Sequence, residues 1–212
     1  MSQEARFVTV DGARMRVRTS PDLGKEFSKP IVLLFHGYSF SLDVWESIGT
    51  FDALSRHGIP YIAIDLPKGK ATKSEKIEKK ELADYVPLLT DLIRELGVNL
   101  DKSKFVIIGP SMGGAFALAF ALKNTAKVLG LVLIAPSLSG VNEESLKNLE
   151  IPVLLVWGDR DNVFPVEQYG RELKQALPQS KLLIIKGARH PAYLDRPQEF
   201  HELLFDFIEE IS

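Results

Sequence analysis

The sequence of 212 residues contains no cysteine. It therefore cannot form a disulfide bond, a thiolate nucleophile or a cysteine-based zinc or iron–sulfur site, and this agrees with a cytoplasmic location. It also lacks a strong charge of either sign, because its net charge is −2 and its pI is near 6.1. Without a basic field, neither nucleic acid nor an anionic membrane surface is expected as a partner.

Long hydrophobic runs are missing as well. No apolar run approaches the length that spans a membrane, and the N-terminus MSQEARFVTV lacks the pattern of a secretory signal. The remaining composition is that of an ordinary globular chain, with 45% hydrophobic and 25% charged residues. We expect a cytoplasmic monomer with a single domain over residues 1–212, which acts on a small molecule and needs neither cofactor nor metal.

Short apolar runs predict a sheet that is covered by helices on both faces. Residues 7–10 and 13–17 flank Asp11-Gly12 and predict a hairpin with one solvated face. From Pro30 onward, short apolar runs alternate with segments of helical spacing, which is typical of an α/β fold with a mostly parallel sheet. The runs are IVLLF, YIAID, FVIIG, LVLIA, VLLVW and LLII, and the expected helices are residues 42–57, 78–96, 112–123, 165–177 and 197–211.

Ser111 stands at the centre of the segment FVIIGPSMGGAFALAF, between an expected strand and an expected helix. The pattern G-x-S-x-G in this context indicates a nucleophile elbow. The turn is so tight that it needs Gly109 and Gly113, and it lifts the hydroxyl of Ser111 to the N-terminus of a helix. There the backbone N–H of Met112 can bind a developing oxyanion.

A serine hydroxyl needs a base to take its proton and an acid to orient that base. His190 is the one histidine of four in the loop directly after the last expected strand. We prefer Asp161 as the acid, because it lies one step further out than Asp159 in the loop after VLLVW. The alternatives left open are Asp159, Asp65 and Asp195.

The other histidines have simpler interpretations. His36 opens the loop after IVLLF and is expected to make structural hydrogen bonds. His57 lies at the end of a helix, where it would cap the helix, and His201 on the last helix is expected to be exposed. The loop around Ser111 has neither the lysine of a P-loop nor a dinucleotide-binding glycine pattern. A dehalogenase or epoxide hydrolase would need a carboxylate in place of Ser111.

These features together resemble the α/β-hydrolase superfamily over nearly the whole chain. Within it, SFSLDVWESIGTFDALSRHGIPYIAIDLP, GPSMGG and KGARHPAYLDRPQEFHELLFDFI resemble the compact group of α/β-hydrolase domain-containing proteins numbered fourteen, which look like cytosolic serine acyl hydrolases. The resemblance implies an eight-stranded, mostly parallel sheet with an N-terminal hairpin. Its G-x-x-D pattern falls on Gly158 and Asp161, and its oxyanion loop places the second N–H donor at Tyr38. The chain departs from the family at DLPKGKATKS, where members commonly carry a glycine-rich stretch.

The superfamily usually inserts its lid between LVLIA and VLLVW. Here only residues 136–152 connect the two runs, which leaves room for a loop and one short helix but not for a cap domain. We therefore expect a site that is open to solvent. Apolar residues on the surrounding loops would form a shallow acyl pocket. The candidates are Tyr38, Phe40, Leu138, Phe164 and Tyr193.

The resulting hypothesis is a serine carboxylesterase that hydrolyses small, short-chain esters through an acyl-Ser111 intermediate. The same intermediate could instead pass its acyl group to another acceptor, as in an acyltransferase, a deacylase or a perhydrolase. A ligand-binding protein on the same frame is the alternative from another class.

Overall fold

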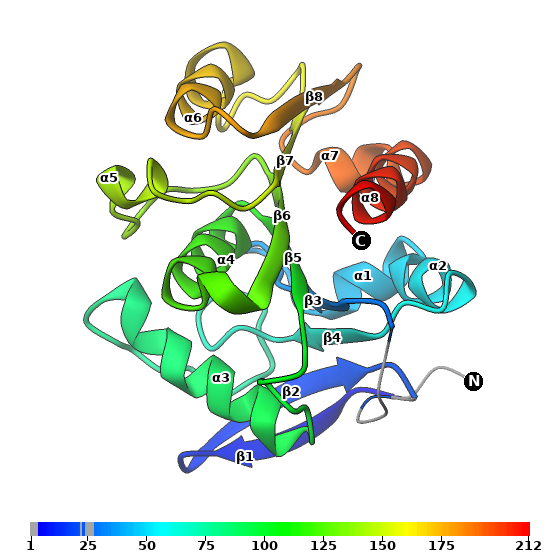
Figure 1. The fold of residues 1–212 in the computed structure, drawn as a ribbon, viewed down its shortest axis with the longest axis vertical. Helices are drawn as coiled ribbons and strands as arrows, with labels where there is room; N and C mark the ends of the chain where they lie inside the picture. Colours follow the sequence, from blue (N-terminus) through cyan, green and yellow to red (C-terminus); the bar gives the residue numbers. More distant parts are fainter. Residues whose placement is uncertain (1–3, 22, 24–27) are drawn as a thin grey trace.

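The computed structural model describes residues 4–21, 23 and 28–212. The strands of this described part form one eight-stranded sheet in the order β1-β2-β4-β3-β5-β6-β7-β8 (Figure 1). β2 pairs antiparallel with β1 and β4, and all the other neighbouring strands are parallel. The predicted mostly parallel sheet with an N-terminal hairpin is confirmed. The strands are β1 Arg6–Val10, β2 Ala13–Thr19, β3 Ile31–Leu34, β4 Tyr61–Ile64, β5 Phe105–Pro110, β6 Val128–Ile134, β7 Val153–Gly158 and β8 Lys181–Ile185.

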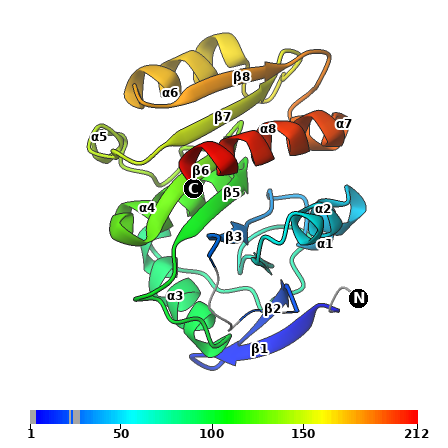
Figure 2. The same ribbon diagram turned by 45° about the vertical axis from the view of Figure 1, so that its right-hand side comes forward.

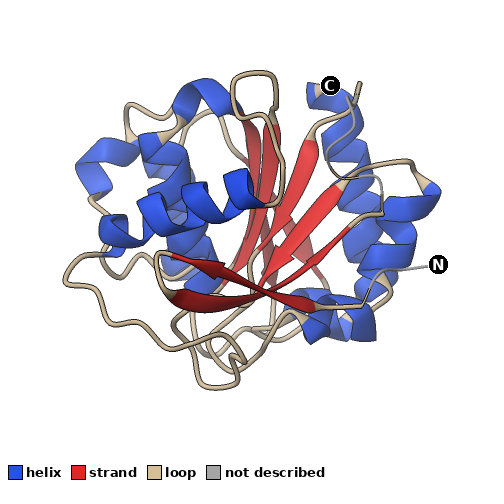
Figure 3. Cartoon of the chain, turned by 90° about the horizontal axis from the view of Figure 1, so that it is seen from below, coloured by secondary structure: helices blue, strands red, loops and turns tan. Residues whose placement is uncertain are grey.

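Helices cover both faces of the sheet (Figures 1 and 3). One face carries α1 Asp43–Ser47, α2 Thr50–Arg56, α7 Ala192–Asp195 and α8 Pro197–Ile211. The opposite face carries α3 Val86–Glu95, α4 Met112–Lys123, α5 Glu143–Leu146 and α6 Arg171–Ala176.

Each inner strand contributes to two hydrophobic layers. In β5, Phe105 and Ile107 pack with the layer beneath α3 and α4, whereas Val106 and Ile108 pack with the layer beneath α1, α2 and α8. This follows from the alternation of side chains along a strand, and it explains why the sequence of β5 is apolar throughout. On the face that carries α1 and α2, α8 crosses β6, where Gly130 leaves room for a side chain of α8, Ile211 (Figure 2).

Three of the expected helices differ in detail. The helix expected over residues 42–57 is split into α1 and α2 by Gly49, which has a φ of 75°. The helix expected over residues 78–96 begins later, with a 3₁₀ turn over Leu82–Tyr85 before α3. The helix expected over residues 165–177 starts as a π-helical turn over Val166–Gly170 that leads into α6. The helices expected over residues 112–123 and 197–211 are confirmed as α4 and α8.

The connection from β6 to β7 contains α5, a helix of four residues, and no cap domain. In the described part of the chain, no helix is both long and apolar enough to cross a bilayer.

Candidate functional site

Ser111 occupies the turn between β5 and α4. Its φ of 49° and ψ of −118° form a conformation that costs a non-glycine residue roughly 1–3 kcal/mol. Main-chain hydrogen bonds to β6 and to the segment after it hold Ser111 there, since Ser111 N–H donates to the Ile134 carbonyl at 3.0 Å and Ser137 N–H donates to the Ser111 carbonyl at 2.9 Å. The neighbouring strand β6 and the segment after it therefore support the strained residue.

The glycines around Ser111 are required by close backbone contacts. A Cβ atom on Gly109 would lie 2.3 Å from the Gly113 carbonyl oxygen, and one on Gly113 would lie 2.8 Å from the His36 carbonyl oxygen. No side chain fits at these separations. The spacing G-x-S-x-G is thus a steric condition for bringing β3, β5 and α4 together at Ser111.

The backbone N–H groups of Tyr38 and Met112 are the expected oxyanion donors. Met112 is the first residue of α4, where N–H groups have no partner within the helix. The described part of the structure assigns no acceptor to either N–H. The carbonyl of Tyr38 accepts a hydrogen bond of 2.7 Å from Lys70 N–H, so the loop after β4 supports the oxyanion loop. Gly69, with a φ of 138°, lies against Tyr38 and Met112.

His190 and Asp161 are joined directly. The Nδ1 atom of His190 lies 2.8 Å from Oδ2 of Asp161, whose side chain is fully buried. The other carboxylate oxygen, Oδ1, accepts hydrogen bonds of 2.8 Å from the N–H groups of Val163 and Phe164. The loop after β7 thus fixes the carboxylate, and the carboxylate fixes the ring. Because Nδ1 is engaged by Asp161, Nε2 is the ring nitrogen that remains available to another group.

The competing acids have other partners. Asp159 accepts a hydrogen bond of 2.6 Å from Gly187 N–H. Asp195 forms a two-point ion pair with Arg189, which lowers the pKa of the Asp195 carboxyl below its ordinary value. Asp65 is buried between Arg16 and the backbone N–H of residue 42. Among these acids, Asp161 is the one whose carboxylate contacts His190.

The hydroxyl of Ser111 has no hydrogen bond to His190 within the described residues. Catalytic hydrogen bonds are often long in structures without substrate and shorten when substrate binds. Both residues follow strands of the same sheet, β5 and β8, whose carboxyl ends lie at one edge.

The remaining histidines serve the fold. His36 is fully buried, with Nδ1 2.9 Å from the Gly37 carbonyl and Nε2 accepting from the N–H of residue 66 at 2.9 Å. His57 bonds the carbonyl of residue 53 within α2. The expectation that His201 is exposed is wrong, because its ring is half-buried against Phe205 and its Nε2 lies 3.0 Å from Thr50 Oγ1.

The predicted pocket residues separate into two groups. Tyr38 is 55% exposed, and Phe40, Leu138 and Phe164 are partly buried at the edges of the two hydrophobic layers. The assignment of Tyr193 to the pocket wall is wrong. Its side chain is 1% exposed, because α7 turns it into the core, where its ring lies 5.1 Å from that of Trp45.

A charged cluster beneath the oxyanion loop was not foreseen. Arg16 of β2 pairs with Asp43 at 2.6 Å and with Asp65 at 3.1 Å, and Lys73 pairs with Asp43 at 2.7 Å. The N–H of Leu42 donates to Asp65 at 2.5 Å. The cluster therefore ties the start of α1 to β2 and to the end of β4. The sequence holds no local signal for these pairs, because Arg16 and Asp65 are 49 residues apart.

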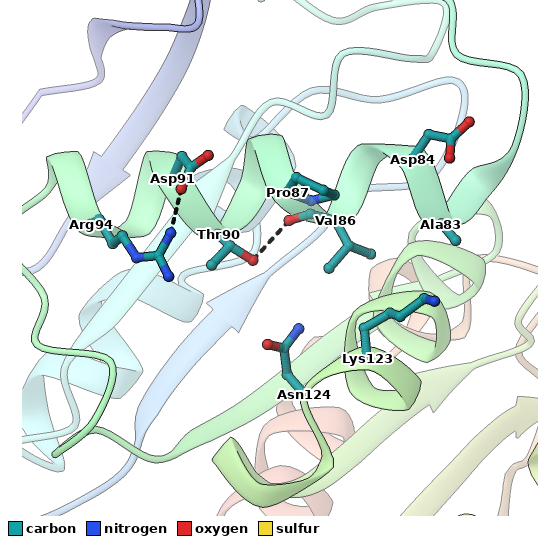
Figure 4. Close-up of a pocket in the computed structure, with 9 residues that line it drawn as sticks. All are labelled: Ala83, Asp84, Val86, Pro87, Thr90, Asp91, Arg94, Lys123 and Asn124. Carbon is teal, nitrogen blue, oxygen red and sulfur yellow. Dashed lines mark hydrogen bonds and ion pairs between the residues drawn. The ribbon is translucent and has the colours of Figure 1, made fainter.

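A separate cavity lies between α3 and the end of α4, with a volume of about 450 Å³ (Figure 4). Its walls include Thr90, Arg94, Lys123 and Asn124, none of which belongs to the site loops. Among the described residues, no cluster of three acidic or histidine side chains could hold a metal ion.

Known proteins resemble this chain in both sequence and structure. The family described as alpha/beta hydrolase fold matches residues 30–147 and 138–197. "Putative protein-lysine deacylase ABHD14B" of Homo sapiens is 34% identical over 182 residues, which cover 85% of this chain and 84% of the relative. "Protein ABHD14A" of Mus musculus is 31% identical over 182 residues, which cover 85% of this chain and 70% of the relative.

Two solved structures show the same fold. A predicted CIB-like hydrolase from Thermoplasma acidophilum superposes with a TM-score of 0.84 at 30% identity, covering 98% of both chains. The carboxylesterase CesB from Bacillus subtilis superposes with a TM-score of 0.80 at 16% identity, covering 98% of this chain and 92% of the other. The similarity to ABHD14A and ABHD14B confirms the predicted resemblance to the group of α/β-hydrolase domain-containing proteins numbered fourteen. This chain belongs to the alpha/beta hydrolase fold family.

Proposed function

We propose that this protein is a serine carboxylesterase that hydrolyses small esters with short acyl chains. The observation that carries the proposal is the hydrogen bond between Asp161 and His190, which stands at the same edge of the sheet as the strained turn of Ser111. A buried carboxylate that orients an imidazole, at the sheet edge where a partly buried serine turn lies, is the arrangement that activates a serine hydroxyl.

In the first half of the reaction, the Ser111 hydroxyl oxygen attacks the ester carbonyl while Nε2 of His190 takes its proton. The N–H groups of Tyr38 and Met112 bind the resulting oxyanion. The C–O bond to the alcohol then breaks, the alcohol leaves with the proton from His190, and the acyl group remains on Ser111. Asp161 keeps Nδ1 protonated and stabilises the charged ring.

In the second half, His190 takes a proton from water as the water oxygen attacks the acyl-Ser111 carbonyl. The second oxyanion collapses, the carboxylic acid is released, and Ser111 regains its proton from His190. Since the connection from β6 to β7 carries no cap domain, small esters reach the serine without the opening of a lid.

The test is steady-state hydrolysis of p-nitrophenyl esters from acetyl to dodecanoyl, with the native chain and Ser111→Ala measured together. We expect activity that peaks at short acyl chains and a kcat lower by about 10⁴ to 10⁶ in the variant. Asp159→Asn is the matched control, because Asp159 lies in the same loop as Asp161 without contacting His190. Turnover that survives the loss of Ser111 would contradict the proposal.

A second candidate is removal of acyl groups from lysine side chains, and the similarity to ABHD14B supports it. The same acyl-Ser111 would form, with an amine as the leaving group. An acetyl-lysine peptide supplied in competition with an acetyl ester would separate the two, since the preferred substrate has the higher kcat/KM.

A further inference from the structure

The atoms near His190 decide what the leaving group contacts. In the proposed function, on which this inference rests, the departing oxygen receives its proton from Nε2 of His190. Proton transfer requires a separation of about 3 Å between the two heavy atoms. Whatever is bonded to that oxygen therefore lies beside the imidazole ring and against the side chains that pack on it.

The side chain packed on the imidazole is aromatic. The ring centroids of Phe164 and His190 are 5.3 Å apart, with the planes at 73°. Behind it, the ring of Tyr169 lies 5.2 Å from that of Phe164, again edge to face. Val163 precedes Phe164 in the same loop. We call Val163, Phe164 and Tyr169 the leaving-group face.

The hydrogen bonds of the Phe164 backbone fix both Asp161 and the leaving-group face. Phe164 N–H donates to Oδ1 of Asp161, and its carbonyl accepts a hydrogen bond of 2.8 Å from the indole N–H of Trp157, which is fully buried. Phe164 is thus anchored on both sides of its Cα atom. A ring fixed in this way offers a preformed surface, and binding to such a surface needs little ordering.

The leaving-group face is apolar and open to solvent. Val163 is 54% exposed and Tyr169 is 39% exposed, and they are two of six large hydrophobic side chains with high exposure among the described residues. A third, Tyr38, lies on the oxyanion loop. Three of these six residues therefore lie on the site loops or on the helical turn that follows one of them, and apolar side chains gathered at the surface mark a place where a ligand binds.

We propose that the leaving-group face selects esters whose alcohol carries an apolar, preferably aromatic, body next to the scissile bond. Phe164 is the specificity-determining residue. An aromatic ring of the alcohol would pack edge to face on Phe164 while its oxygen takes the proton from His190. The contact exists only until the alcohol leaves, so it acts on acylation.

The test compares benzyl acetate with 2-methoxyethyl acetate, whose alcohols have similar acidity and whose acyl-enzyme is the same. The variants are Phe164→Ala, Phe164→Tyr, which restores an aromatic ring, and Phe7→Ala. Phe7 is 47% exposed on the edge strand β1 and serves as a control for loss of a surface ring. The quantity measured is the ratio of the two kcat/KM values.

We expect the native chain to favour benzyl acetate and Phe164→Ala to lower the ratio about tenfold, as the loss of one aromatic pair implies. Phe164→Tyr and Phe7→Ala should keep the native ratio. If Phe164 served only to position His190, the variant would slow both esters and deacylation together and leave the ratio unchanged, which would overturn the inference.

A native ratio near one would also overturn the inference, while turnover that depends on Ser111 would leave the proposed function standing. Absence of ester turnover in the native chain would remove both.

Discussion

The buried ring of His36 predicts a loss of stability in acid. Its Nε2 accepts a hydrogen bond from the N–H of Leu66, so Nδ1 carries the proton and donates to the Gly37 carbonyl. Burial lowers the pKa of His36 below its ordinary value, although the Gly37 carbonyl and the carboxylate of Asp65, 3.7 Å away, act in the opposite direction. A second proton on Nε2 would break the bond to Leu66.

The magnitude follows from proton linkage. The ordinary pKa of histidine is near 6.5, and the folded value lies below it. As pH falls past 6.5, the unfolded chain takes up the proton first, so acid favours unfolding. The stability from His36 is complete above the unfolded pKa, and each pH unit between the two pKa values removes up to about 1.4 kcal/mol of unfolding free energy.

The assay is urea unfolding from pH 7.5 to pH 5 at constant ionic strength, followed by the fluorescence of the two buried tryptophans, Trp45 and Trp157. His36→Gln keeps a donor and an acceptor but does not titrate. We expect this variant to be less stable than the native chain at pH 7.5 and the difference to shrink toward pH 5. His201→Gln should reduce the dependence of the unfolding free energy on pH as well, but by less. Burial also lowers the pKa of His201, although its ring is only half-buried. Parallel curves for the native chain and His36→Gln would refute the reasoning.

Three further predictions concern the site and its support. Asp161→Asn should lower kcat for an acetyl ester by about 10⁴, whereas Asp159→Asn should change it by less than about tenfold, and equal losses would contradict the assignment of the acid. Gly109→Ala should lower the melting temperature sharply because of the 2.3 Å contact, whereas Gly37→Ala, whose nearest contact is 3.6 Å, should be tolerated, and similar melting curves would argue against the steric role of Gly109. Asp65→Asn should lower the unfolding free energy by about 2 kcal/mol in urea titrations, because it weakens the charged hydrogen bonds from Arg16 and from the Leu42 N–H while Arg16 keeps its pair with Asp43, and a change below about 0.5 kcal/mol would contradict this role of Asp65.

The mostly parallel sheet could be predicted because its inner strands β3, β4, β5 and β7 are buried on both faces. A run such as FVIIG has no polar position, and this distinguishes it from the half-exposed hairpin at the N-terminus. The break at Gly49 was missed because α1 and α2 share one apolar pattern, which does not reveal a residue with positive φ between them. The four-residue helices α5 and α7 are too short to show any periodicity.

The site could be predicted only where local pattern fixes geometry. The spacing of Gly109 and Gly113 around Ser111 requires a turn, so the turn was foreseen. The choice between Asp159 and Asp161 depends on which carboxylate faces the ring of His190, and spacing does not show this. Tyr193 was placed wrongly because the orientation of a side chain three residues after His190 depends on α7.

The short connection between β6 and β7 also bears on the fate of the acyl group. A cap domain would shield acyl-Ser111 from the solvent and let a chosen acceptor arrive first. Here only α5 and its flanking loops join the two strands, so in the mechanism that we propose solvent would reach the intermediate throughout its lifetime. An amine or thiol acceptor would have to react faster than water because it is bound beside Ser111, and not because a cap domain excludes water from the site.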